Sequence, residues 1–331
     1  MPSSSFFSQF LCSSNTNVAF ILQRLVSRIG CVYLANHNMP VIAFSPVSYC
    51  IQKNKKILHY TRNQKSEYKQ TELQDFKSFM DIQKTEHSAH FDGFNGGYIG
   101  FFDYNFSTNQ QIHNQHRQQP AFFLGQYLTF LRLENQQWVF YSTEENSEEI
   151  FNNIKHLIKN KPISTPSFSM TMPCQARWNK NQYLNAFKKI QDYIRAGDCY
   201  QINLTQEFTA KTTGNLLDAA HELWQLTNAP YAGYLKIDDF ELLSCSPELF
   251  IDFETERKIV TKPIKGTMPR YADPILDEQS KQTLKSSKKD QAENVMIVDL
   301  LRNDLSVYAE TGSVKTPKLF EIESFNQVHH M

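Results

Sequence analysis

A lysine at position 265 has the setting of a nucleophile. Lys265 lies in TKPIKGTMPR between an apolar residue and a glycine, with Pro263 and Pro269 framing the segment. A lysine amine attacks carbon only when it is neutral, a state that burial favours. The following Gly266 and Thr267 would offer backbone N–H groups and a hydroxyl to an anion. The same spacing also fits a solvated turn, and on spacing alone the turn is favoured.

Three carboxylates could complete a site around that amine. Glu248 follows Pro247 in SPELF and begins an apolar strand, where it is either an exposed strand start or, in a dry pocket, a proton donor to a leaving hydroxyl. Asp290 and Glu293 are three residues apart in DQAENVMIVDLLRND and share one helix face. They are either partners of the helix dipole or ligands of Mg²⁺, which typically takes one or two protein carboxylates.

The elements that would hold these side chains make the second half a strand-rich α+β region. Apolar residues recur at helical spacing over 183–194 and Gly197 ends that pattern. A second helix is predicted over 215–226, a hairpin over 231–246 with Asp238-Asp239 in its turn, and a third helix over 290–304. The third helix is apolar nearly all round, so we expect it to be buried.

The first half predicts strands with few helices. Residues 18–28 form a short helix, 40–51 form strands interrupted by Pro46, and 121–142 form a hairpin with Glu134-Asn135 in the turn. A segment with three prolines at 160–173 indicates a boundary. We therefore predict an N-terminal α+β domain over 1–165 and a second domain over 166–331.

Bulk composition excludes several classes of function. Lys plus Arg and Asp plus Glu both number 34, so the chain gives no sign of a nucleic-acid partner. No apolar run is long enough for a membrane span and no phosphate-cradling glycine motif occurs. The six cysteines are scattered, which predicts reduced thiols in a cytoplasmic protein. His113 and His116 have a spacing that hints at a metal, but a solvated polar loop is favoured.

Six motifs together resemble a known family. They are AGDCYQINLTQEF (196–208), SPELF (246–250), KPIKGTMPR (262–270), KDQAENVMIVDLLRND (289–304), GSVKTPKLF (312–320) and VHHM (328–331). In this order they resemble the chorismate-utilising enzymes over 175–331, and FNGGYIGFFDY gives a looser likeness in the first half. The resemblance implies an anthranilate synthase component I-like fold, with antiparallel sheets and flanking helices, incomplete at the C-terminus.

Lys265 distinguishes members of that family. Its P-I-K-G-T form resembles aminodeoxychorismate synthase component I, whereas anthranilate synthases resemble P-I-A-G-T. In the former, the lysine is understood to attack chorismate at C2 as the C4 hydroxyl leaves; ammonia then adds at C4 and the lysine departs. The product serves p-aminobenzoate and folate synthesis. The resemblance implies that Lys265 is the nucleophile and Glu248 the acid.

The same resemblance implies the remaining site residues. Glu293 would bind Mg²⁺ against the substrate carboxylate, and Asp290 matches a nearby acidic position that assists through water. Gly266, Thr267 and His330 would contact the substrate. Mg²⁺ is thus the expected cofactor.

The same resemblance implies a protein partner and leaves two alternative functions open. Ammonia would come from a separate glutamine amidotransferase subunit, because the chain shows no amidotransferase Cys/His arrangement. Family members continue beyond the histidine with further substrate and metal residues, so we expect a C-terminally truncated chain that has little activity alone. The alternatives are anthranilate synthase component I and a non-catalytic binding fragment.

Overall fold

The computed structural model describes residues 6–13, 17–36, 39–82, 93–104, 106, 119–160 and 167–331. The predicted His113 and His116 pair lies outside them. By their contacts the described residues fall into two units. One comprises Met1–Pro162 with Ala220–Met331, and the other comprises Ile163–Ala219.

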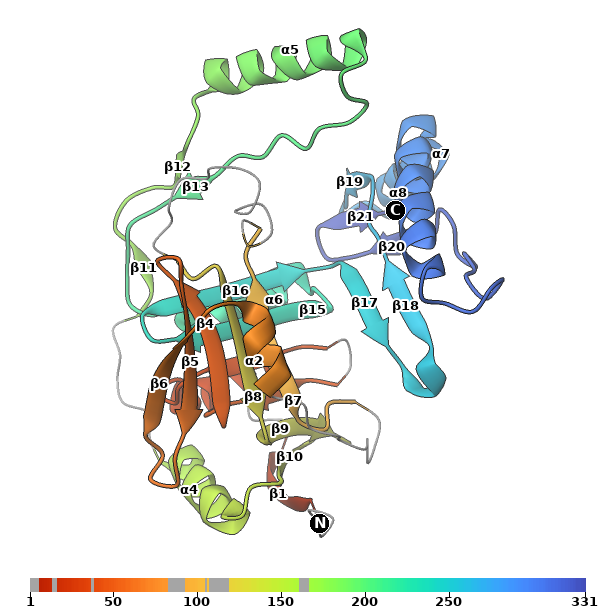
Figure 1. The fold of residues 1–331 in the computed structure, drawn as a ribbon. Coiled ribbons are helices and arrows are strands. Elements are labelled where there is room, and N and C mark those ends of the chain that lie inside the picture. Colours follow the sequence, from red (N-terminus) through yellow and green to blue (C-terminus); the bar gives the residue numbers. More distant parts are fainter. Residues whose placement is uncertain are drawn as a thin grey trace. The chain divides into compact units, whose positions relative to one another are not determined.

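An antiparallel sheet dominates the larger unit, with seven strands among the described residues in the order β1-β10-β9-β3-β2-β15-β16 (Figure 1). Val32 of β2 pairs with Leu235 of β15, so the sheet takes strands from both sides of the boundary predicted at 165. The domain division itself stays a prediction. The strands are β1 (Phe7–Ser13), β2 (Cys31–Leu34), β3 (Val41–Ala43), β9 (Thr129–Glu134), β10 (Gln137–Ser142), β15 (Tyr231–Ile237) and β16 (Phe240–Ser246).

Two tight turns set the register of this sheet. The hairpin of β15 and β16 turns at Asp238-Asp239, as predicted. Between β9 and β10 the turn is Asn135-Gln136, with φ of 46° and 62°, which is the left-handed pair that a two-residue hairpin requires. The predicted turn was therefore one residue early. The predicted hairpin also began too soon, because β8 (Phe122–Tyr127) pairs in another sheet.

A second antiparallel sheet faces the first. Within the described residues it has five strands in the order β6-β5-β4-β8-β7. Val32 and Leu235 from the first sheet and Ile51 and Phe123 from the second belong to one buried cluster, so the main core lies between the sheets. The remaining strands are β4 (Ser48–Lys53), β5 (Lys56–Arg62), β6 (Tyr68–Leu73) and β7 (Gly97–Phe102).

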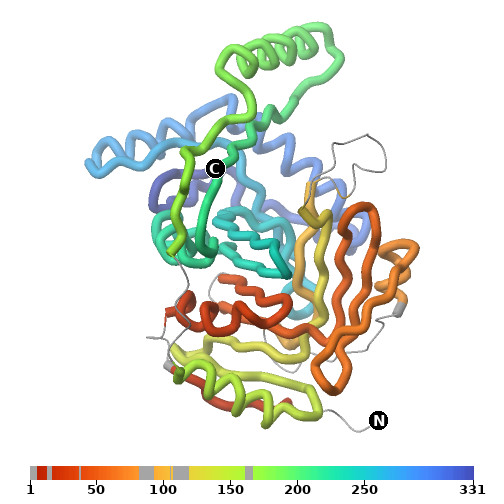
Figure 2. Tube along the Cα trace, turned by 90° about the vertical axis from the view of Figure 1, so that its left-hand side faces the viewer, coloured from red at the N-terminus to blue at the C-terminus, as the bar shows by residue number. Residues whose placement is uncertain are grey.

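Helices cover the outer faces of both sheets. Tyr33, which alternates with Val32 along β2, stacks on Trp224 of α6 at 4.8 Å between ring centroids. Phe151 of α4 packs on Phe140 of β10, and the tube of α4 runs beside β1 in Figure 2. Phe79 of α2 packs on the far side of the second sheet. The helices are α1 (Val18–Leu25), α2 (Phe76–Ile82), α4 (Ser147–Lys159) and α6 (Leu217–Thr227).

The C-terminal part of the larger unit carries the predicted site. Asp273 caps α7 and Ser287 caps α8 through side-chain acceptors for backbone N–H groups. The prediction that this last helix, α8, is buried is wrong. Only Asn294 of this helix is buried and Leu300 is 55% exposed, because the described residues leave most of its apolar surface uncovered. The elements are β17 (Leu249–Phe253), a 3₁₀ turn (Thr255–Arg257), β18 (Ile259–Lys262), β19 (Thr267–Pro269), α7 (Pro274–Ser286), α8 (Lys288–Ser306), β20 (Glu323–Ser324) and β21 (Val328–His330).

Among its described residues, the smaller unit contains the helix α5, two short strand pairs and the first residues of α6. Helix α5 (Lys180–Ala196) begins in a capping box of Asn179 and Gln182, and it ends at Gly197 with φ of 79°. The predicted helix and its stop are confirmed. The strand pairs are β11 (Ser169–Met170) with β14 (Thr212–Thr213) and β12 (Gln175–Ala176) with β13 (Phe208–Thr209).

Two features bear on the predicted location of the protein. Five of the cysteines are free thiols, namely Cys31, Cys50, Cys174, Cys199 and Cys245. Among the described residues no helix is both long enough and apolar enough to cross a membrane. The cytoplasmic location stays a prediction.

Candidate active site

The segment that carries Lys265 is held in place by the end of the chain. The Lys265 N–H donates to the Met331 carbonyl at 2.8 Å, and the Met331 N–H donates to the Gly266 carbonyl at 3.2 Å. These bonds continue the pairing of β19 with β21 toward the lysine. Lys265 is partly buried, and its ammonium has no ion-pair partner in the described residues.

Gly266 brings the lysine segment against the start of α8. Its φ is 84°, in the left-handed region. A Cβ at this position would stand 2.9 Å from Leu284 Cδ1, 3.0 Å from Asp290 Cβ and 3.1 Å from Asp290 Cγ. Only a residue without a side chain combines this backbone geometry with that approach. The predicted substrate-binding glycine and the predicted acidic residue Asp290 are therefore direct neighbours.

Glu248 contacts the backbone of Ile264, the residue that precedes Lys265. Its carboxylate accepts a hydrogen bond from the Ile264 N–H at 3.0 Å. The side chain is exposed, because it stands in the short loop between β16 and β17. The structure thus places Glu248 against the segment that carries Lys265, but the dry pocket that the acid role calls for is not formed by the described residues.

Thr267 and His330 form the other side of the site. The Thr267 Oγ1 lies 2.9 Å from His330 Nδ1, across a β19–β21 pair. Burial lowers the pKa of His330, while a hydrogen bond with the Gly266 backbone and the charges of Glu248 and Glu323 oppose the shift. The imidazole is therefore neutral at pH 7, and it can exchange a hydrogen bond with Thr267 or with a ligand.

Asp290 and Glu293 are the candidates for holding Mg²⁺. Both are partly buried on one face of α8, a helical turn apart, and the Asp290 N–H is capped by Ser287. Among the described residues no group of three His, Cys, Asp or Glu side chains converges as a metal shell. A pair of carboxylates nevertheless fits Mg²⁺, which completes its shell with water and an anionic ligand. Asp290 approaches Gly266 directly, whereas Glu293 lies one turn further along.

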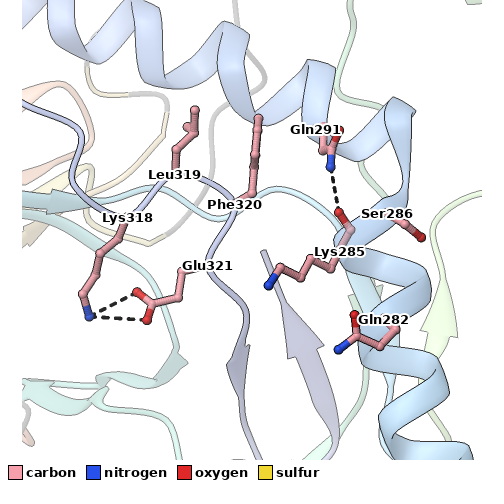
Figure 3. Close-up of a pocket in the computed structure, with 8 residues that line it drawn as sticks. All are labelled: Gln282, Lys285, Ser286, Gln291, Lys318, Leu319, Phe320 and Glu321. Atoms are coloured by element: carbon pink, nitrogen blue, oxygen red, sulfur yellow. Dashed lines mark hydrogen bonds and ion pairs between the residues drawn. The ribbon is translucent and has the colours of Figure 1, made fainter.

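A groove of about 540 Å³ lies near the turn between α7 and α8 but contains none of the seven predicted site residues (Figure 3). The Gln291 amide donates to the Lys285 carbonyl at 2.8 Å, and Lys318 pairs with Glu321 at 3.2 Å. The candidate site therefore lies outside this groove. The groove is lined by Gln282, Lys285, Ser286, Gln291, Lys318, Leu319, Phe320 and Glu321.

Sequence reasoning missed a polar network beneath the site. Arg270 donates to both oxygens of Asp277 at 2.8 and 3.0 Å, and Asp277 also lies 3.1 Å from His329 Nε2. Arg270 is the last residue of the motif KPIKGTMPR, and His329 precedes the predicted His330. The signal that could have found His329 is strand alternation, which points it to the opposite face from His330.

Comparison with known proteins assigns the family. The sequence profile described as chorismate binding enzyme matches residues 31–331. The chain therefore belongs to the chorismate-binding enzyme family.

Two relatives indicate which enzyme of this family the chain resembles. The chain is 37% identical to aminodeoxychorismate synthase component 1 of Escherichia coli over 243 residues, covering 72% of this chain and 53% of the relative. It is 45% identical to the protein of that name from Klebsiella aerogenes over 165 residues, covering 50% and 36%. It thus spans between a third and about half of these relatives' length.

The fold matches that of anthranilate synthase component I from Streptococcus pneumoniae. The TM-score is 0.71 at 21% identity, covering 88% of this chain and 68% of the other. The Escherichia coli isochorismate synthase MenF gives 0.60 at 15% identity, covering 98% and 69%. The predicted anthranilate synthase component I-like α+β fold is confirmed.

Proposed function

We propose that this chain forms the chorismate-binding part of an aminodeoxychorismate synthase component I. That enzyme would convert chorismate and ammonia to 4-amino-4-deoxychorismate. The observation that supports the proposal is that Glu248 bonds Ile264 and Asp290 lies against Gly266, the two residues that flank Lys265. The identities of 37% and 45% to relatives of this name support it.

The residues suggest a two-step substitution. The neutral Lys265 amine attacks C2 of chorismate, the ring double bonds shift, and the C4 hydroxyl leaves as water with a proton from Glu248. The attacking nitrogen loses a proton, which restores the Glu248 acid, and the new nitrogen–carbon bond gives a secondary amine on the protein. Ammonia then attacks C4, the double bonds shift back, and the bond to the lysine nitrogen breaks with return of a proton. Thr267 and His330 orient the substrate during both steps.

A metal ion and a protein partner belong to the same proposal. Asp290 and Glu293 would hold Mg²⁺, which would neutralise a substrate carboxylate when bound. The relatives are named component 1, which implies a second component. We propose that a glutamine amidotransferase subunit supplies the ammonia, in the cytoplasm.

Anthranilate synthase component I is the second candidate. The chain is 30% identical over 274 residues to anthranilate synthase alpha subunit 2 of Oryza sativa, covering 72% of this chain and 45% of the relative. Lys265 argues against this activity, because the resemblance gives anthranilate synthases an alanine there. Product identification separates the two, since anthranilate is fluorescent and forms without a lyase.

Intact-mass spectrometry tests the covalent step. The chain is co-expressed with a C-terminal fragment that supplies the family's further substrate and metal residues. The complemented protein is incubated with chorismate and Mg²⁺ without ammonia, and an adduct equal to chorismate minus water is expected. Lys265→Ala should form none. Lys262→Ala is the matched control, because Lys262 is a nearby exposed lysine that pairs with Glu323 at 3.6 Å and should not change the adduct. Equal adducts on wild type and Lys265→Ala would refute the nucleophile assignment.

A further inference from the structure

Two faces of β21 serve two different purposes. His330 faces Thr267 at the candidate site, while His329 points the opposite way and is 2% exposed. A nearly fully buried histidine next to a site residue requires partners for both ring nitrogens. The structure supplies both.

His329 joins three separate elements. Its Nδ1 lies 2.8 Å from Ser324 Oγ on β20, and its Nε2 lies 3.1 Å from Asp277 Oδ1 on α7. Arg270, which follows β19, binds both Asp277 oxygens and lowers the pKa of that carboxyl well below its usual range. An ionised carboxylate only accepts, so His329 Nε2 carries the hydrogen. The other ring nitrogen, Nδ1, shares a hydrogen bond with the Ser324 hydroxyl.

Arg270 and Asp277 also make hydrogen bonds with backbone groups. Arg270 donates through a terminal nitrogen to the Phe325 carbonyl at 2.7 Å, and its own N–H donates to the Gln327 carbonyl at 3.0 Å. The Tyr271 N–H donates to Asp277 at 2.9 Å. The Asp277 carboxylate on α7 therefore links this helix to the segment after β19 and to β21 through charge-assisted bonds. His329 extends the link to β20 through Ser324.

We propose that His329 is a positioning residue: by fixing β21 to α7 it determines where Lys265 and His330 stand in the site. The segment that carries Lys265 is bonded to the end of the same strand. Lys265 and Gly266 exchange backbone hydrogen bonds with Met331, two residues beyond His329. Release of His329 would free the strand that anchors both site residues. The catalytic consequence rests on the proposed function, but the positional claim does not.

Hydrogen exchange tests the positional claim without any activity. In His329→Leu, amides in peptides covering 264–268 and 328–331 should exchange at least about tenfold faster, since a hydrogen bond to a charged group is lost. His329→Gln keeps an N–H near Asp277 and should lie closer to wild type. Ser142→Ala is the control, because it removes a buried hydroxyl that lies 2.8 Å from Thr129 in another sheet. It should leave these peptides unchanged.

Ser324→Ala provides a second route should His329→Leu fail to fold. This exposed position loses only the Nδ1 partner, and a smaller acceleration of the same peptides is expected. Unchanged exchange in folded His329→Leu, or in Ser324→Ala where His329→Leu does not fold, would overturn the positioning role.

The rate of adduct formation then tests the catalytic consequence. A displacement of about 1 Å lowers such rates about 100-fold, so His329→Leu should slow the adduct strongly at saturating chorismate. The rate is expressed per folded molecule, because a purely destabilised protein would lose active molecules without changing that rate. An unchanged rate per folded molecule would overturn this consequence. No adduct on wild type would refute the proposed function and leave the exchange result standing.

Discussion

Replacement of Gly266 by alanine probes the closest contact in the candidate site. The new Cβ would lie 2.9 to 3.1 Å from atoms of Leu284 and Asp290, distances that real Cβ atoms rarely adopt. The left-handed φ of 84° costs an L-residue about 1–2 kcal/mol. Inserting a methyl group into a filled space costs about 1–3 kcal/mol more. We therefore expect Gly266→Ala to lower the free energy of unfolding by about 2–5 kcal/mol in total.

Gly312 offers a matched control for the backbone part of this effect. Its φ is 80°, and a Cβ there would meet nothing within 4 Å. Gly312→Ala should therefore lower the free energy of unfolding by about 1–2 kcal/mol. The excess in Gly266→Ala, about 1–3 kcal/mol, measures the contact with Leu284 and Asp290.

Urea denaturation followed by circular dichroism measures both variants. The change in the unfolding free energy follows from the shift in the midpoint, provided that the slope is unchanged. Equal destabilisation by the two substitutions would show that Gly266 has room beside Asp290. The close approach of the lysine segment to α8, and the site built on it, would then be wrong.

Three further outcomes are expected. Glu248→Gln should keep an acceptor for the Ile264 N–H, leaving the unfolding midpoint unchanged, yet it should slow adduct formation about 100-fold or more if Glu248 is the acid. An unchanged rate would remove Glu248 from the chemistry. The double variant Asp290→Asn with Glu293→Gln should abolish the heat of Mg²⁺ binding in titration calorimetry, and retained binding would place the ion elsewhere. Burial lowers the pKa of His59, so the unfolded chain takes up a proton first as the pH falls through about 6.5, and stability should decrease from there downward. His59→Gln should flatten part of that slope in thermal unfolding, and an unaltered slope would show that His59 contributes nothing to it.

Local patterns predicted one helix with its stop and one hairpin turn correctly, and placed the turn after β9 one residue early. The helix over 183–194 with its glycine stop and the Asp238-Asp239 hairpin depend on neighbours in sequence, which periodicity and turn chemistry report directly. The burial of α8 was not predictable in this way. Its apolar residues indicate that a partner surface is needed, but periodicity does not say whether the described chain supplies one.

The site shows the same division between residue types and contacts. The chemistry of Lys265, Glu248 and Asp290 is indicated by their motifs. The structure places Glu248 against Ile264 and Asp290 against Gly266, the two residues that flank Lys265. The pairing of Lys265 with Met331 joins residues 66 positions apart, since 331 minus 265 is 66, and no local pattern reports it. The bond between His329 and Asp277 was missed for the same reason, since it depends on tertiary packing.

The strand order of the large sheet has a consequence for how the protein is made. β2 leaves the ribosome early but receives its neighbour β15 only after almost 200 further residues have been synthesised. At about 5–20 residues per second that delay lasts on the order of ten seconds or more, during which the edge of β2 has unpaired backbone groups. Such distant pairing predicts slow folding, and it makes the nascent N-terminal half a substrate for chaperones.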